Sequence, residues 1–238
     1  MNMWKLNKLF LFLIFQIFLI GLICPIRVHA VTCTAASDGD WRSVTWTGCD
    51  APGYPVSGDA AVIGATRAIT IQNGQTDAAD SLTFTNTGST LTITGTLNIS
   101  GAVTQNNAAN ATWSNTIAGT GTLSAASVVV GGTTALSGSN TTRTTTLITT
   151  ITAFNVSGNV TVTGVDPGTP DNDGRLYINE GTMDVDGVIT LTPAGQAVAI
   201  LRMDQGAQTG TLNISNASPI SGSGTFTVNG TSATVNYN

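Results

Sequence analysis

The chain has 238 residues, with eight basic residues, thirteen acidic residues and one histidine. Beyond residue 30 it keeps five arginines and all thirteen acids but no lysine or histidine, so this part carries a formal charge of −8. It therefore lacks the basic stripe that follows nucleic-acid phosphates, which argues against a nucleic-acid partner. It also lacks the side chains for histidine triads, histidine metal sites and Schiff-base lysines.

The start of the chain has the form of a secretory signal. Two lysines precede an apolar run of 16 residues over 9–24, and Val28 and Ala30 stand at positions −3 and −1 of a cleavage site. The run is shorter than the roughly 20 residues that a membrane-spanning helix needs. We therefore predict that residues 1–30 are a signal peptide. The mature chain, from Val31, is then secreted or held at the cell surface without a membrane span.

Two cysteines remain after this cleavage, Cys33 and Cys49. An even pair in an exported chain predicts a structural disulfide. Closing such a short loop stabilises the fold by about 3 kcal/mol in the loop-entropy model.

The next part of the chain, residues 31–64, differs from the rest because it is rich in bulky side chains. It holds both cysteines together with Trp41 and Trp46. We predict that it is a cap that covers strand edges at the start of the core. The alternative is that the two tryptophans and Tyr54 form an exposed aromatic platform for sugars.

Strand patterns dominate residues 65–238, and helix patterns are nearly absent. Short runs alternate apolar residues with Thr, Asn or Ser, at 68–72, 81–85, 90–94, 96–100, 159–163 and 187–192. This alternation predicts that one face of each strand is buried and the other is exposed to solvent. Some of the strands recur every 6 to 9 residues, and the motif Thr-Leu-Asn-Ile-Ser occurs at both 96–100 and 211–215. This spacing favours an all-β solenoid of stacked coils, with an antiparallel β-sandwich as the alternative.

The early motifs resemble a known family. The segments Asp40-Trp-Arg-Ser-Val-Thr-Trp46 and Tyr54-Pro-Val-Ser-Gly-Asp59, with the strand runs that follow, resemble the opening of bacterial secreted or cell-surface right-handed parallel β-helix proteins. They are also similar to the G8-type module of some extracellular proteins. The resemblance covers roughly residues 40–105 and implies a right-handed β-helix with an adhesin-like or scaffold role and no defined catalytic residues. At Gly58-Asp59 we expect a turn whose carboxylate accepts backbone N–H groups.

Residues 232–238 alternate as a strand, with no capping helix or polar tail after them. An uncapped solenoid end exposes unpaired backbone. We therefore expect a truncated β-helix that continues in a longer chain, which we favour, or an end that stacks on a partner.

The densest acidic cluster suggests a calcium site. Read from Thr169, Asp171, Asp173 and Glu180 fall at positions 3, 5 and 12 of an EF-hand-type loop. Thr169 replaces the usual first aspartate and Pro170 stiffens the entry, so a true EF-hand is not expected. The hypothesis is a looser calcium site at a solenoid loop, and the alternative is a solvated loop.

The same region contains carboxylates that could support catalysis. Some right-handed β-helices are pectin-type lyases and hydrolases, and paired carboxylates suit acid–base work on a glycosidic bond. Asp184 and Asp186 should share one face of a strand, and an arginine base for a lyase is near in sequence only at Arg175 and Arg202. Adjacent aspartates with a histidine, the polygalacturonase pattern, do not occur. We therefore expect no enzyme.

The expected function is that of an exported, non-catalytic structural or adhesion protein. Its Thr/Asn-rich surface would face glycans or other cell-surface components. A carbohydrate-binding module and a calcium-dependent polysaccharide lyase or hydrolase are the alternatives. We expect Asp77 and Asp80 to be solvated charges that discourage sideways strand pairing.

Overall fold

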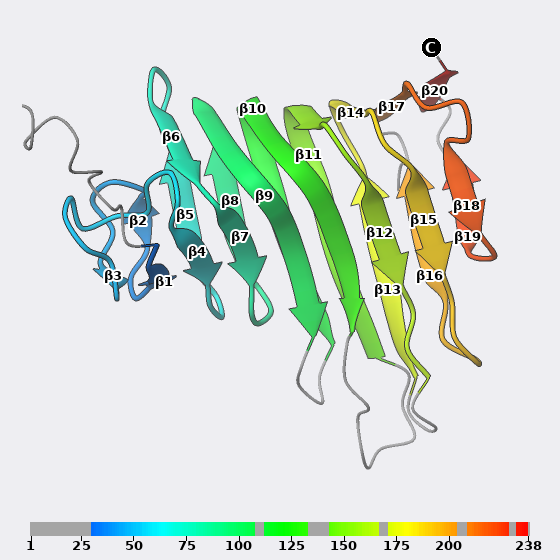
Figure 1. Ribbon diagram of the computed structural model, residues 1–238, viewed down its shortest axis with the longest axis horizontal. Coiled ribbons are helices and arrows are strands. Elements are labelled where there is room, and N and C mark those ends of the chain that lie inside the picture. The colour runs from blue at the N-terminus through cyan, green and yellow to red at the C-terminus, as the bar shows by residue number, and fades with distance from the viewer. Residues whose placement is uncertain are drawn as a thin grey trace, which may run out of the picture.

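The computed structural model describes residues 30–107, 112–132, 143–166, 171–203, 209–228 and 232–237. In this part of the chain the regular elements are all strands, and they wind into a parallel β-solenoid of about six turns (Figure 1). The predicted all-β solenoid is confirmed. The strands pair in parallel except for β1 with β3, so the chain does not form the alternative antiparallel sandwich.

Each coil has three sides, which we call faces A, B and C. Face A stacks β1 (Thr32–Ala35), β4 (Ala60–Ile63), β7 (Ser81–Phe84), β12 (Val160–Thr163), β15 (Ile189–Thr192) and β18 (Ile220–Gly222). Face B stacks β2 (Gly39–Asp40), β5 (Ala68–Ile71), β8 (Thr90–Ile93), β13 (Asn172–Ile178), β16 (Ala199–Met203) and β19 (Thr225–Val228). Face C stacks β6 (Thr76–Ala79), β14 (Thr182–Val185), β17 (Thr211–Ile214) and β20 (Thr234–Tyr237).

Three long strands bend from one face to the next. They are β9 (Thr96–Asn107), β10 (Trp113–Gly132) and β11 (Arg143–Val156). The middle one belongs to all three faces, because its residues pair with β8, then with the start of β9, then with β12. It turns at Gly119, which has φ 117°. A Cβ atom there would collide with the carbonyl oxygen of Ile93, so only glycine fits this corner.

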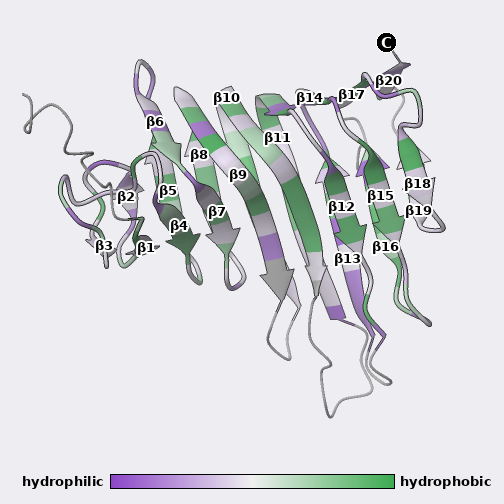
Figure 2. Ribbon diagram, in the orientation of Figure 1, coloured by the Kyte–Doolittle hydropathy of each residue, from purple (hydrophilic) through white to green (hydrophobic). Residues whose placement is uncertain are grey.

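The core is built from columns of inward side chains in register. On face C one column contains Leu97, Leu123, Phe154, Met183 and Leu212, all almost fully buried. Apart from Ala153, their neighbours along each strand are polar and point outward, as the alternating pattern predicts. Apolar and polar bands therefore alternate along the strands (Figure 2).

The signal prediction for residues 1–30 falls outside the described residues except for Ala30. The described residues contain no helix that is long and apolar enough to cross a membrane. The 31–64 segment contributes β1 and β4 to face A, and β3 (Trp46–Thr47) pairs antiparallel with β1. The predicted disulfide joins Cys33 to Cys49.

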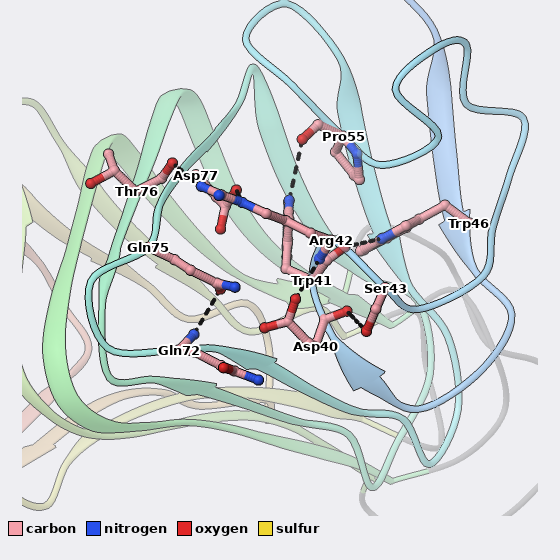
Figure 3. Close-up of polar contacts among 10 residues, drawn as sticks. All are labelled: Asp40, Trp41, Arg42, Ser43, Trp46, Pro55, Gln72, Gln75, Thr76 and Asp77. Atoms are coloured by element: carbon pink, nitrogen blue, oxygen red, sulfur yellow. Dashed lines mark hydrogen bonds and ion pairs between the residues drawn. The ribbon is translucent and has the colours of Figure 1, made fainter.

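The two tryptophans of this segment are buried rather than exposed. The Trp41 indole N–H donates to the carbonyl oxygen of Pro55 at 3.2 Å, and that of Trp46 donates to the carbonyl oxygen of Trp41 at 2.7 Å (Figure 3). Their rings meet edge to face with centroids 4.9 Å apart. Because Trp41 and Trp46 are covered, the pair cannot present the alternative sugar platform, and its contacts are those of a packed cap.

The Gly58-Asp59 turn has the predicted form. The Asp59 carboxylate accepts hydrogen bonds from the backbone N–H groups of Val31, at 3.2 Å, and Val56, at 3.1 Å. Gly58 has φ 98°, a conformation that favours glycine. This aspartate therefore ties the first residue of the predicted mature chain to β4.

The prediction that Asp77 is a solvated charge is wrong, because its side chain is buried. The alternation of β6 points it inward, in register with Leu97. Arg42 reaches over from the cap, so that its Nε donates to the Asp77 carboxylate at 2.7 Å and its Nη2 to the Thr76 carbonyl at 2.8 Å (Figure 3). The hydrogen bond to Asp77 raises the pKa of Arg42. Asp80 is exposed as expected, and it accepts a hydrogen bond from Ser100.

Candidate functional site

Face C carries an outward column of polar side chains along the solenoid. The column contains one residue from each of six successive coils, Asn98, Ser124, Asn155, Asp184, Asn213 and Asn236. The Asn213 amide donates to the Asp184 carboxylate at 2.5 Å, and the Asn236 amide donates to the Asn213 side-chain oxygen at 2.8 Å. The repeated Thr-Leu-Asn-Ile-Ser motif places its asparagine in this column both times. We call it the face C column.

A hollow of about 460 Å³ lies beside this column, at the corner where face C turns toward face A. The hollow forms because the side chains at this corner are small. Its lining includes Ser100, Ala126 and Ser157. Asn155 and Asp184 of the column also line the hollow. It therefore presents amide, hydroxyl and carboxylate groups together, and we call it the face C furrow.

Asp184 and Asp186 both line the face C furrow, which agrees with the prediction that they share one face of a strand. The two arginines considered as lyase bases belong instead to face B. Arg175 Nη2 donates to Asp173 at 2.7 Å, and the Arg202 guanidinium lies 5.8 Å from the centre of the Tyr177 ring. Among the described residues that line the furrow there is no arginine.

The Arg175 side chain forms hydrogen bonds with its neighbours on β13. Burial lowers the pKa of its guanidinium, but hydrogen bonds to Asp173 and Tyr177 outweigh this, so the pKa is raised overall. The other Asp173 oxygen accepts the backbone N–H of Val198 at 2.9 Å. Both oxygens of Asp173 thus have protein partners.

The three residues of the calcium hypothesis are not brought together. Asp171 and Asp173 lie at the start of β13, and Glu180 follows its end. An extended strand rises about 3.3 Å per residue, which places Glu180 roughly 20 Å beyond Asp173. Glu180 lines a separate hollow of about 440 Å³ between faces B and C. In the described part of the chain, no group of three or more His, Cys, Asp or Glu side chains has an arrangement that could hold a metal ion.

Asp171 has a raised pKa. The causes are loss of solvation and the nearby carboxylates of Asp166 and Asp173, with an added hydrogen bond to Asp166. Asp166 in turn accepts the backbone N–H of Gln196 at 2.9 Å. A negative charge at Asp171 is therefore disfavoured by folding.

We expect Asp171→Asn to raise the melting temperature at neutral pH. The folded-state pKa lies above the unfolded-state value, so the destabilising effect of the charge is absent below the unfolded-state pKa and grows as pH rises through the folded-state pKa. Melts of both proteins in chelator-containing buffer, at pH 7 and near pH 3, test this. A gain of equal size at both pH values, or none at pH 7, would contradict it.

Comparison of the chain with models of protein families, with curated proteins and with solved structures found no match in any of the three.

Proposed function

We propose that the mature chain is an exported, non-catalytic β-solenoid that acts as a rigid extracellular or surface scaffold and binds glycans in the face C furrow. The observation that carries the proposal is the furrow itself, with Asn155 and Asp184 on its wall. The resemblance of the early motifs to bacterial surface β-helices agrees with an adhesive role.

The cap supports the exported location. The Cys33–Cys49 disulfide suggests an oxidising, extracellular environment, because cytosolic thiols are kept reduced. The predicted signal peptide would deliver the chain there.

The chemistry of the furrow supports a glycan. Sugar hydroxyls both donate and accept hydrogen bonds, and the furrow offers both kinds of partner. The Asn155 amide donates and accepts, the Asp184 carboxylate accepts, and the Ser124 and Ser157 hydroxyls do either. Its volume, about 460 Å³, lies within the range of small-ligand sites. Ile99, Ala126 and Val156 also line it and add apolar surface.

The stacked coils support the scaffold role. The face C column holds its side chains at the spacing of paired strands, about 4.8 Å, so these polar groups are already in position before a ligand binds. A site built on such strands loses little conformational freedom on binding.

The test is binding of the mature chain, residues 31–238, to a panel of immobilised extracellular and cell-wall polysaccharides. We expect Asn155→Ala to weaken binding about two- to tenfold, which corresponds to the loss of one hydrogen bond worth about 0.5–1.5 kcal/mol. Thr161→Ala, an outward position on β12 of face A, is the matched control and should bind as the unaltered chain does. Absence of binding by the unaltered chain, or equal losses in both variants, would refute the proposal.

A further inference from the structure

The face C furrow is elongated along the solenoid axis. Its lining residues come from four successive coils, through the strands β9, β10, β11 and β14. At the spacing of paired strands, four coils extend over about 14 Å. The furrow therefore crosses the strands, and its shape suits a linear molecule that lies along the axis of the solenoid.

Carboxylates stand at both ends of the furrow. Asp184 and Asp186, from the fourth of these coils, line it directly. At the first coil, the hydroxyl of the lining residue Ser100 donates a hydrogen bond to the Asp80 carboxylate at 2.9 Å. Asp184 uses one oxygen to accept the Asn213 amide, and Asp186 is exposed. Each end of the furrow thus offers negative charge to a ligand.

The basic side chains of the mature chain all lie away from these carboxylates. The mature chain has five arginines and no lysine or histidine. All five arginines are described residues, and none of them lines the furrow. They lie in the cap or at face B, and they are Arg42, Arg67, Arg143, Arg175 and Arg202. The negative charge of the furrow is therefore left for a cationic ligand.

An ammonium group suits the furrow better than a metal ion does. Calcium takes about six to eight oxygen ligands, and the furrow lining holds two carboxylates. An ammonium group donates about three hydrogen bonds, which carboxylate, hydroxyl and amide oxygens can accept. Such charge-assisted hydrogen bonds are stronger than those between neutral groups.

We propose that the ligand of the face C furrow is a linear amino-sugar oligosaccharide whose amino groups are free and protonated. This inference rests on the proposed function and names its substrate class. The ammonium groups pair with Asp184 and Asp186, while the ring hydroxyls bind Asn155 and the serines of the other coils. Glycans that carry uronate or sulfate groups are repelled, because like charges would meet in the furrow.

The test compares three tetrasaccharides, composed of glucosamine, N-acetylglucosamine or galacturonate, by calorimetric titration of the mature chain in chelator-containing buffer. The glucosamine tetramer should bind about tenfold more tightly than the N-acetylated one, because acetylation removes the positive charge. Added salt should weaken binding of the glucosamine tetramer and leave that of the N-acetylated tetramer nearly unchanged. The galacturonate tetramer should bind most weakly.

The variant Asp186→Asn separates charge from shape, because the amide keeps the size of the side chain. We expect it to weaken binding of the glucosamine tetramer about threefold, as for an exposed ion pair, and to leave binding of the N-acetylated tetramer unchanged. Asp50→Asn is the matched control. It removes the same charge from an exposed position in the cap and should bind as the unaltered chain does.

The outcomes distinguish this inference from the proposed function. Equal or tighter binding of the N-acetylated or galacturonate tetramer would overturn the inference and leave glycan binding in place. Equal effects of Asp186→Asn and Asp50→Asn would overturn it as well. A lysine tetrapeptide that binds as tightly as the glucosamine tetramer would show recognition of charge alone, and the sugar assignment would then fail. If none of the three tetrasaccharides and no polysaccharide of the panel binds, both proposals fail.

Discussion

Replacing Trp41 with alanine should lower the free energy of unfolding by about 3–5 kcal/mol, the usual range for emptying a large buried aromatic site. Trp41 is 0% exposed, packs edge to face on Trp46 and donates to Pro55. Its loss opens a cavity beneath the cap and leaves the Pro55 carbonyl without this donor. Urea unfolding followed by circular dichroism measures the change.

Trp41→Phe is the control, because it keeps most of the ring volume but lacks the indole N–H. We expect it to be intermediate in stability. If Trp41→Ala unfolds at the same urea concentration as the unaltered chain, the cap does not stabilise the solenoid, and its role as an end closure fails.

Replacing Arg42 with alanine should also destabilise the fold, because it leaves the buried Asp77 carboxylate without its partner. A buried group left in this way costs about 1–3 kcal/mol, and more when it is charged. One Asp77 oxygen, Oδ2, already has no hydrogen-bond partner in the described structure, so the remaining oxygen depends on Arg42. The same urea measurement detects the change.

The double variant Arg42→Ala/Asp77→Leu separates charge from packing. Leucine at 77 would extend the apolar column that begins at Leu97, so most of the lost stability should return. This follows the general finding that apolar replacement of a whole buried ion pair is often neutral or stabilising. If the double variant is no more stable than Arg42→Ala, the destabilisation does not come from the unpaired carboxylate.

Strand alternation predicted which side chains face the core, and the short, uniform spacing of the strands favoured the solenoid over the antiparallel sandwich. The pattern of Thr-Leu-Thr-Ile over 90–93 forces every second side chain inward, and parallel stacking then aligns Leu91 with Ile69 and Ile117. The same logic failed to assign Asp77, because its charge suggested solvent although its position in β6 is an inward one. The alternation of β6 already indicated that Asp77 points inward. Its partner, Arg42, lies in a distant segment that only the fold brings close.

The site was less predictable for a physical reason. Asp171, Asp173 and Glu180 are close in sequence, but the extended strand β13 separates Glu180 from the two aspartates. In contrast, Asn98, Asn155 and Asn213 are far apart in sequence and fall into one column. The coil lengths that set this column vary along the chain, so no fixed repeat reveals it. Only the repeated Thr-Leu-Asn-Ile-Ser motif hinted at the face C column.

The stacking of coils determines the order in which the solenoid unfolds. Each coil is held by its neighbours in the stack, so stability follows a one-dimensional nearest-neighbour rule. The first coil is anchored by the disulfide and the tryptophans, whereas β18, β19 and β20 each pair on one side only within the described residues. For a polypeptide of residues 31–238, we expect unfolding to begin at β18 to β20 and to proceed toward the cap.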